Sequence, residues 1–354
     1  MKYSFVIPVY NRPDEAEELL RSLSQQTLSK DYFEVIIVED GSEQTCEKVC
    51  DTYRRILNIH YYKKENGGPG PARNFGVERA QGEYVIILDS DVVLPRHYLD
   101  EVNGELAFRA CDAFGGPDRA HESFTQMQKA ISYSMTSFFT TGGIRGGRKN
   151  IDKFFPRSFN MGIRRDVYLE LGGFQPMRFG EDIDFSYRII EAGYTTRLFS
   201  EAWVWHKRRT DLDKFFKQVY NSGIARINLG KRHPGTTHLV HTLPMVFTLS
   251  VIALLVLAII LRLCTLSQGV SDIGFLGIPA SLVWLLPLAP VLLFILLIFL
   301  DSSIRNHSMV IGFLSVEAAF VQLFGYGFGF MKAWWVRNVL KRGEFYAFEK
   351  NFYE

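Results

Sequence analysis

The chain has 354 residues, and its 40 lysines and arginines nearly balance 38 aspartates and glutamates, giving a formal net charge of +2. This balance gives no electrostatic reason to expect a nucleic-acid partner. Apolar residues make up 47% of the sequence. They become almost continuous beyond about residue 238, which indicates a membrane-associated last third.

The beginning of the chain and its cysteines both indicate a cytosolic N-terminal domain. Lys2 is followed at once by a strand-like run that is too short for a secretory signal. The four cysteines have no metal-binding spacing, so they are expected to be reduced and buried.

The first half alternates short apolar runs with helical segments. The expected strands are Phe5–Tyr10, Phe33–Val38, Ile59–Tyr62 and Tyr84–Leu88. One expected helix begins at Pro13, and two others cover Thr45–Leu57 and Phe75–Ala80. Apolar runs without alternation are typical of a mostly parallel sheet covered on both faces, so we expect a doubly wound α/β domain. Ligands of such domains bind beyond the carboxyl ends of the strands.

Polar residues follow several of these strands. Asn11 follows the first, Asp40 the second, and Asp89-Ser90-Asp91 the fourth. Carboxylates brought together by a turn can hold Mg²⁺ or Mn²⁺ with the phosphates of a ligand. An isolated D-x-D pattern is more often a strand end with solvated aspartates.

Three more segments carry candidate chemistry, each with a structural alternative. The glycine-rich loop Asn66–Asn74 brings Arg73 toward a phosphate or a base, or is a flexible connection. Gly180–Arg188 begins with crowded carboxylates that supply a general base or favour a helix N-terminus. His206 ends the short strand that begins at Trp203, and a lone histidine is more often structural than a metal ligand. Because all these features lie at element ends of one α/β domain, their combination favours an active site.

These residues form five motifs that occur in a known order and spacing. The motifs are Phe5–Arg12, Val35–Ser42, Asn66–Asn74, Gly82–Asp91 and Gly172–Asp184. Over roughly Lys2–Lys207 the chain resembles glycosyltransferase family 2, of the GT-A fold, in its membrane-anchored bacterial form. The resemblance implies a Rossmann-like catalytic domain that transfers a sugar from a nucleotide-sugar with inversion.

The resemblance also implies roles for individual residues. The donor-binding residues would be Pro8, Tyr10, Arg12, Asp40, Arg73, Asp89, Ser90 and Asn160. Pro8, Tyr10, Arg12 and Asp40 would line the nucleobase pocket. Ser90 would act as a spacer between the two aspartates. Asp91 and His206 would hold Mn²⁺ or Mg²⁺, and Asp182 would deprotonate the acceptor, with Glu181 as the second choice. The glycine-rich Thr140–Arg148 would close over the site, or is an ordinary connection.

The last third is expected to embed in a membrane. The segments Leu243–Leu261, Leu276–Leu300 and Met309–Met331 are each long enough to span it. The expected organisation is a transferase domain at 1–210, an amphipathic interfacial helix and linker at 211–238, about three membrane helices at 239–336 and a basic, aromatic tail at 337–354. Three spans would place this basic tail opposite the cytoplasmic domain, against the positive-inside rule. Either the third segment is re-entrant or interfacial, or the rule fails here, so three segments are expected and the side of the tail stays open.

The sequence therefore predicts a metal-dependent, inverting transferase at the bacterial inner membrane. Its donor would be a nucleotide-sugar, with UDP favoured by family prevalence, and its acceptor a lipid-linked or membrane-associated glycan of the cell envelope. A processive polysaccharide synthase is the first alternative, although only three apolar segments and no Gln-x-x-Arg-Trp motif are present. A non-catalytic scaffold is the second, although the carboxylates and Arg73 are intact.

Overall fold

The structure is a computed structural model, and it describes residues 1–119, 124–141, 154–207, 211–267 and 279–347. The chain divides into two compact units. Unit 1 comprises Met1–Ser123 and Gly146–Lys207, and unit 2 comprises Phe124–Arg145 and Arg208–Glu354. The inclusion of a segment near residue 130 in unit 2 was not indicated by the sequence patterns.

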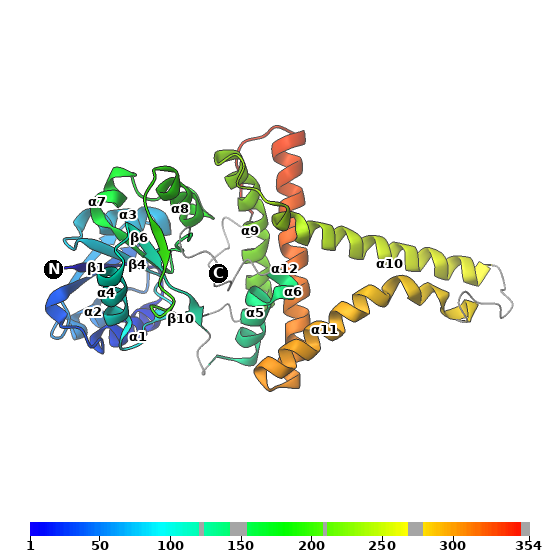
Figure 1. Cartoon of the computed structure of the whole chain (residues 1–354), viewed down its shortest axis with the longest axis horizontal. Helices are drawn as coiled ribbons and strands as arrows, with labels where there is room; N and C mark the ends of the chain where they lie inside the picture. The colour runs from blue at the N-terminus through cyan, green and yellow to red at the C-terminus, as the bar shows by residue number, and fades with distance from the viewer. Residues whose placement is uncertain (120–123, 142–153, 208–210, 268–278, 348–354) are drawn as a thin grey trace. The chain divides into compact units, whose positions relative to one another are not determined.

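Unit 1 is built on a seven-stranded sheet in the order β3-β2-β1-β4-β8-β6-β9 (Figure 1). The strands are β1 Tyr3–Val9, β2 Phe33–Asp40, β3 Ile59–Lys64, β4 Tyr84–Leu88, β6 Ala113–Gly115, β8 Asn160–Arg164 and β9 Thr196–Leu198. The first four pair in parallel, and β8 is antiparallel to both β4 and β6. The predicted mostly parallel α/β sheet is therefore confirmed.

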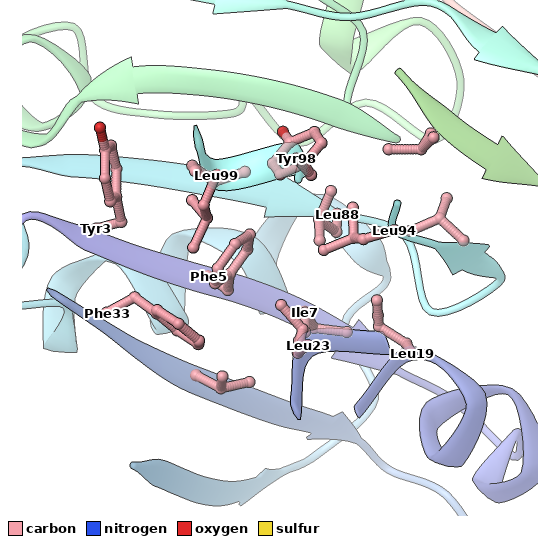
Figure 2. Close-up of a cluster of buried hydrophobic side chains, with 14 of the residues drawn as sticks. Tyr3, Phe5, Ile7, Leu19, Leu23, Phe33, Leu88, Leu94, Tyr98 and Leu99 are labelled. Atoms are coloured by element: carbon pink, nitrogen blue, oxygen red, sulfur yellow. The ribbon is translucent and has the colours of Figure 1, made fainter. Parts of the chain in front are cut away.

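Helices cover both faces of this sheet. They are α1 Pro13–Ser24, α2 Glu47–Tyr53, α3 Pro69–Arg79, α4 Tyr98–Phe108, α7 Arg165–Glu170 and α8 Glu181–Glu191. One core contains side chains of α1, α2 and α4, and the other contains side chains of α3, α7 and α8. Figure 2 shows the first core, in which Phe5 of β1, Leu23 of α1 and Tyr98 of α4 are buried together. The strands have apolar side chains on both faces because both faces are buried.

A second, three-stranded sheet has the order β5-β10-β7. Its strands are β5 Val92–Val93, β7 Asp118–Arg119 and β10 Val204–His206. The strand β10 is antiparallel to β5 and parallel to β7. This small sheet follows β4 directly, so it begins at the carboxyl edge of the large one.

Unit 2 is helical. Its elements are α5 Gln126–Thr136, α6 Phe138–Thr141, α9 Leu212–Arg232, a 3-10 turn Leu239–Thr242, α10 Leu243–Ser267, a 3-10 helix Ala280–Leu288, α11 Ala289–Asn306, α12 Met309–Trp334 and a π turn Trp335–Val339. Three described segments are long and apolar enough to cross a membrane, namely Leu239–Leu266, Leu282–Asn306 and Met309–Val339.

The helices α9 and α12 lie in close backbone contact. A Cβ atom on Gly329 would lie 2.0 Å from the carbonyl oxygen of Tyr220, and one on Gly223 would lie 2.3 Å from that of Tyr326. Glycine is therefore required on both helices at this crossing. The apolar face of α9 that includes Phe215 and Val219 packs with α5 and α12. Protein therefore covers these two side chains of the segment 211–238, which was expected to be an amphipathic interfacial helix and linker.

Candidate active site

The ends of β1 and β2 are tied together beside the carboxyl edge of the sheet. Asn11 follows β1 with a φ of 53°, in the left-handed region that asparagine tolerates. Its side-chain oxygen accepts hydrogen bonds from the backbone N–H of Glu43 at 2.8 Å and of Gln44 at 3.0 Å. Its own N–H donates to Ser42 Oγ at 2.8 Å. These bonds fix the loop that carries the predicted donor-binding residues of β1.

The pairing of two short strands brings His206 to Asp91. In β10, His206 is paired with Val92 of β5, the residue directly after Asp91. The Nε2 atom of His206 lies 3.2 Å from Asp91 Oδ1. The backbone N–H of Lys207 also donates to the carbonyl of Asp91 at 3.0 Å. Residues 115 positions apart in the sequence thus meet because of strand register.

Asp89 completes a group of three metal-binding side chains. One ligand atom each from Asp89, Asp91 and His206 can be chosen so that all lie within 4.8 Å of one another. Two carboxylates and an imidazole suit Mn²⁺ and Mg²⁺, which prefer oxygen ligands and accept a nitrogen. The donor set therefore fits a divalent cation. The guanidinium Nη1 of Arg12 lies 3.7 Å from Asp91 Oδ2 and donates to Glu15 at 2.8 Å.

Arg73 connects the aspartates to the first turn of α8. From α3 its Nη2 donates to Asp89 Oδ1 at 2.7 Å and its Nη1 to Glu181 Oε1 at 3.0 Å. The guanidinium also lies 5.3 Å from the centre of the Phe174 ring. Only 3% of Arg73 is exposed. Burial alone would lower its pKa, but the charges of Asp89 and Glu181 raise it, so the arginine stays ionised.

The two acidic residues that begin α8 have opposite pKa shifts. Burial raises the pKa of Glu181 to about 7, although the charge of Arg73 opposes the shift. Burial would also raise the pKa of Asp182, but the charge and hydrogen bond of Arg157 lower it below the usual value. The Nε atom of Arg157 donates to Asp182 Oδ2 at 2.6 Å. Asp182 is therefore ionised at neutral pH, whereas Glu181 titrates there.

Asp40, at the end of β2, is held by its own chain. Its Oδ1 accepts from Lys64 Nζ at 2.6 Å and from the N–H of Gly67 at 3.0 Å, and its Oδ2 accepts from the N–H of Gly68 at 2.8 Å. Asn66 donates to the Asp40 carbonyl at 2.9 Å. We call these residues the Asp40 clamp. The clamp fixes the start of the glycine-rich loop that leads into α3 and Arg73.

The structure does not bring every predicted residue into one cluster. Asn160 starts β8 opposite Leu88, but its amide accepts from Tyr98 at 2.6 Å and donates to the carbonyl of Ala202 at 2.8 Å. This amide is 1% exposed and lies in the core. Ser90 is buried between the two aspartates. The donor-contact roles of both residues stay predictions.

Pro8 and Tyr10 are partly buried at the end of β1. The structure does not test their predicted contacts with the nucleobase. The predicted glycine-rich loop Thr140–Arg148 lies outside the described residues from position 142 onward.

Sequence reasoning missed several residues that the structure places at the site. Arg157 pairs with Asp182, and Lys64 pairs with Asp40. The Phe159 ring stacks on His206 at 5.0 Å, and Asp118 Oδ2 lies 3.9 Å from His206 Nδ1. None of the four belongs to the five motifs. The only available signal was Lys64, which stands just before the glycine-rich loop and two residues after the expected strand Ile59–Tyr62.

Comparisons with known proteins give the family of the first part of the chain. Residues 4–172 match the model of glycosyl transferase family 2. Poly(ribitol-phosphate) beta-N-acetylglucosaminyltransferase TarS of Staphylococcus aureus (strain Mu50) is 37% identical over 103 residues, covering 28% of this chain and 18% of TarS. Glycosyltransferase AglE of Haloferax volcanii is 24% identical over 240 residues, covering 64% of this chain and 73% of AglE.

A solved structure shares the fold. The mannosyltransferase PcManGT of Pyrobaculum calidifontis, in complex with GDP-Man and Mn²⁺, has a TM-score of 0.60 and 16% identity, covering 91% of this chain and 87% of that one. The chain spans only about a fifth of the first curated relatives it matches, 22% and 18% of their lengths. Motifs, fold and family model nevertheless agree, and residues 4–172 form a glycosyl transferase family 2 domain.

Proposed function

We propose that the protein is a divalent-metal-dependent, inverting glycosyltransferase that moves a sugar from a nucleoside diphosphate to an acceptor hydroxyl. The observation that carries this proposal is the convergence of Asp89, Asp91 and His206 within 4.8 Å. The same Asp89 is connected through Arg73 to the acidic start of α8. Asp89 of the cation-binding group and Glu181, the second choice for the base, thus share one buried arginine, Arg73.

Asp89, Asp91 and His206 would hold the cation, and each has a distinct neighbour that orients it. When bound, Mn²⁺ or Mg²⁺ there neutralises charge that develops on the leaving diphosphate. Arg73 orients Asp89 and carries a fixed positive charge toward the same place. Phe159 stacks on the His206 ring and limits its rotation. The chain therefore holds its ligands ready before the donor binds, which reduces the reorganisation needed for transfer.

Asp182 is the proposed base. In a single displacement, the acceptor oxygen forms a bond to the anomeric carbon as the bond from that carbon to the diphosphate oxygen breaks. The acceptor proton passes to Asp182, and the electron pair leaves with the diphosphate. Asp182 is suited to accept this proton because Arg157 keeps it ionised at neutral pH. Glu181 is assigned to holding Arg73, with the base role as the alternative.

The donor is proposed to be a UDP-sugar, with a GDP-sugar as the competitor. The name of TarS describes transfer of N-acetylglucosamine to poly(ribitol-phosphate), and PcManGT was solved with GDP-Man. Pro8, Tyr10, Arg12 and Asp40 lie at or just after the ends of β1 and β2, where the nucleoside would bind. We propose a membrane-associated glycan or lipid-linked acceptor at the bacterial inner membrane, because candidate membrane helices follow the transferase unit in the same chain.

The test is a donor panel of UDP-, GDP- and dTDP-sugars, measured as release of the nucleoside diphosphate from the purified full chain with and without Mn²⁺. We expect turnover with Mn²⁺ and its loss after chelation. Asp91→Ala should lower kcat/KM by about a thousandfold, since metal stabilisation of a leaving group contributes several kcal/mol. Asp100→Ala, at a more exposed aspartate of α4, is the matched control and should leave the rate unchanged. Full turnover by Asp91→Ala would refute the metal role.

A further inference from the structure

The three segments that could span a membrane differ in how much protein covers them. In the most apolar window of each, 17% of residues are buried for Leu239–Leu266 and 6% for Leu282–Asn306, against 39% for Met309–Val339. A span that faces lipid leaves much of its surface uncovered by protein. The third segment, which is α12, is therefore in a different environment from the first two.

The helix α9, which packs against α12, carries polar and charged side chains in addition to its apolar face. Along α9, the buried side chains include Asn221, Arg226 and Asn228, and Lys214 and Lys231 are exposed. The glycine contacts between α9 and α12 leave no room for lipid between the two helices. Since α9 carries charge at both ends and buried polar groups between them, it is poorly suited to the hydrocarbon core of a bilayer. Its tightly packed partner α12 is then expected to stay outside that core as well.

The uncovered face of α12 carries a carboxylate. Glu317 is exposed, one turn from the exposed Phe313, and it lines a crevice with Leu292 and Phe299 of α11. As part of a membrane span, this carboxylate would face lipid well inside the helix. At the membrane surface, the same face places its aromatic rings among acyl chains and Glu317 at the level of the headgroups.

The other two candidate segments form a hairpin suited to a bilayer. Figure 1 shows α10 and the 3-10 helix before α11 running side by side away from α9 and α12, and the two are in contact. Exposed apolar side chains along the hairpin include Leu249, Leu255, Ile259, Leu263, Leu282, Leu285 and Leu292. The charge-free stretch Leu243–Leu261 of α10 extends about 28 Å at 1.5 Å per residue, close to the hydrocarbon thickness of a bilayer, and ends just before Arg262.

The C-terminal segment is fixed to α9. The Asn221 amide donates to the carbonyl of Ala347 at 2.9 Å and accepts from its N–H at 2.9 Å. Arg232 donates to both carboxylate oxygens of Glu344 at 2.7 and 2.8 Å. Phe345, Tyr346 and Ala347 pack against the cluster formed by α9 and α12. The tail therefore lies on the same side of a membrane as α9.

We propose that the chain is anchored by a two-pass hairpin, formed by α10 and by the 3-10 helix with the start of α11, whose partner is the lipid bilayer. In this arrangement α5, α9 and α12 lie at the membrane surface. Only residues 208–210 separate Lys207 from Asp211 in the sequence, too few to cross a bilayer, so the proposal assigns unit 1 and α9 to one side of the membrane. The catalytic unit and the tail thus share one side.

The distribution of charge agrees with this topology. The hairpin tip has Arg262 and Asp272 as its charged residues between positions 262 and 279. The opposite end carries Lys231, Arg232, Arg305, Lys332, Arg337, Lys341 and Arg342. Two passes place all these basic residues on one side, as the positive-inside rule requires for a cytoplasmic side. The conflict that three spans would create does not arise.

Cysteine labelling of the full chain in bacterial spheroplasts tests the proposal. Cys264 near the hairpin tip is exposed, whereas Cys46, Cys50 and Cys111 are buried, so the native chain already carries a tip reporter. In a Cys264→Ser background, single reporters are placed by Gly343→Cys in the tail, Glu101→Cys in unit 1 and Arg305→Cys in the last turn of α11. A membrane-impermeant maleimide is added before or after lysis. The readout needs no substrate, so it is independent of the proposed transfer reaction.

Two passes predict that Cys264 is labelled in intact spheroplasts, and that the Gly343, Glu101 and Arg305 reporters react only after lysis. Labelling of the Gly343→Cys chain before lysis, with Glu101→Cys protected, would show that α12 spans the membrane and would overturn the proposal. Protection of Cys264 until lysis would show that the hairpin does not cross. Labelling in denaturant confirms that each thiol is reactive, and the Cys264→Ser chain alone gives the background.

Discussion

Two carboxylate sites lie at the carboxyl edge of the same sheet, and they differ in how their charge is balanced. Both oxygens of Asp40 are satisfied by this chain, through Lys64 and two backbone N–H groups. At the other site, Asp89 and Glu181 share the buried guanidinium of Arg73, and Asp91 lies 3.7 Å from Arg12. The Asp40 clamp is complete as folded, whereas the Asp91 site has an excess of negative charge that a cation would neutralise.

This difference predicts which carboxylates act in catalysis and which stabilise the fold. Removing a carboxylate from the clamp leaves unpaired N–H groups and lowers stability, whereas removing one from the acidic site relieves repulsion and lowers activity. A substitution in the Asp40 clamp should therefore lower stability more than activity, and loss of a carboxylate from the acidic site should lower activity more than stability. The predictions below test this contrast.

The largest effect is expected for Asp182→Asn. Loss of a general base lowers kcat by about 10²- to 10⁴-fold, and the fold should tolerate the change because Arg157 can still contact solvent. Steady-state kinetics and thermal unfolding measure the two quantities. Asp184→Asn is the matched control two residues away, where Asp184 pairs with Arg188 at 3.0 Å, and it should lower stability more than turnover. Normal turnover by Asp182→Asn would show that another group acts as the base.

Arg73→Met should lower both quantities. The substitution leaves Asp89 and Glu181 without their shared partner, and breaking a buried ion pair costs about 3–5 kcal/mol of unfolding free energy. Urea unfolding measures this loss, and Mn²⁺ titration measures weaker ordering of Asp89. Arg79→Met on the same helix, where the guanidinium lies over Phe75, is the control and should cost much less. Equal stability of the two variants would show that Arg73 does not bridge the acidic site.

Asp40→Asn should affect stability more than turnover. An asparagine can satisfy only some of the three donors of the clamp, so we expect a loss of about 1–3 kcal/mol. Because the clamp fixes the glycine-rich loop before α3, the KM for the donor should rise while kcat changes little. Glu43→Gln on the neighbouring exposed loop provides the control. A large fall in kcat with unchanged stability would give Asp40 a direct catalytic role and would remove the contrast between the two sites.

Much of the fold could be predicted because local patterns carry it. Tyr84–Leu88 is a strand with the predicted bounds, since five consecutive apolar residues fit a strand buried on both faces. The helix α3 begins at Pro69, six residues before the prediction, because Pro69 and Pro71 fit the first turn of a helix. The start of α3 was not predicted because the sequence around Pro69 is rich in glycine.

The rest depended on contacts between distant residues. His206 reaches Asp91 through the register of β5 and β10, which a strand pattern of two or three residues does not reveal. Arg157 pairs with Asp182 from outside any motif. The helix α5 joins unit 2 through the packing of Ile131 and Met135 with α9 and α12, although it is flanked in sequence by unit 1. Such contacts are set by tertiary packing and leave no periodic signal.

The smallest effect, and the finest test of the contrast, is the pH dependence of Glu181→Gln. Burial raises the pKa of Glu181 to about 7, so this carboxyl gains a proton as the pH falls through neutrality and its pairing with Arg73 weakens. Wild-type kcat/KM should then fall on the acid side of about pH 7. The base contributes no inflection there, because Arg157 lowers the pKa of Asp182 and keeps it ionised.

Glutamine imitates the protonated carboxyl at every pH and still accepts a hydrogen bond from Arg73. The Glu181→Gln variant should therefore lose less than about tenfold in kcat/KM, the effect of one charge-assisted hydrogen bond, and its profile should be flat through neutrality. An inflection that persists in this variant would belong to another group. A loss as large as that of Asp182→Asn would instead make Glu181 the base, and the structural and catalytic roles within the first turn of α8 would be exchanged.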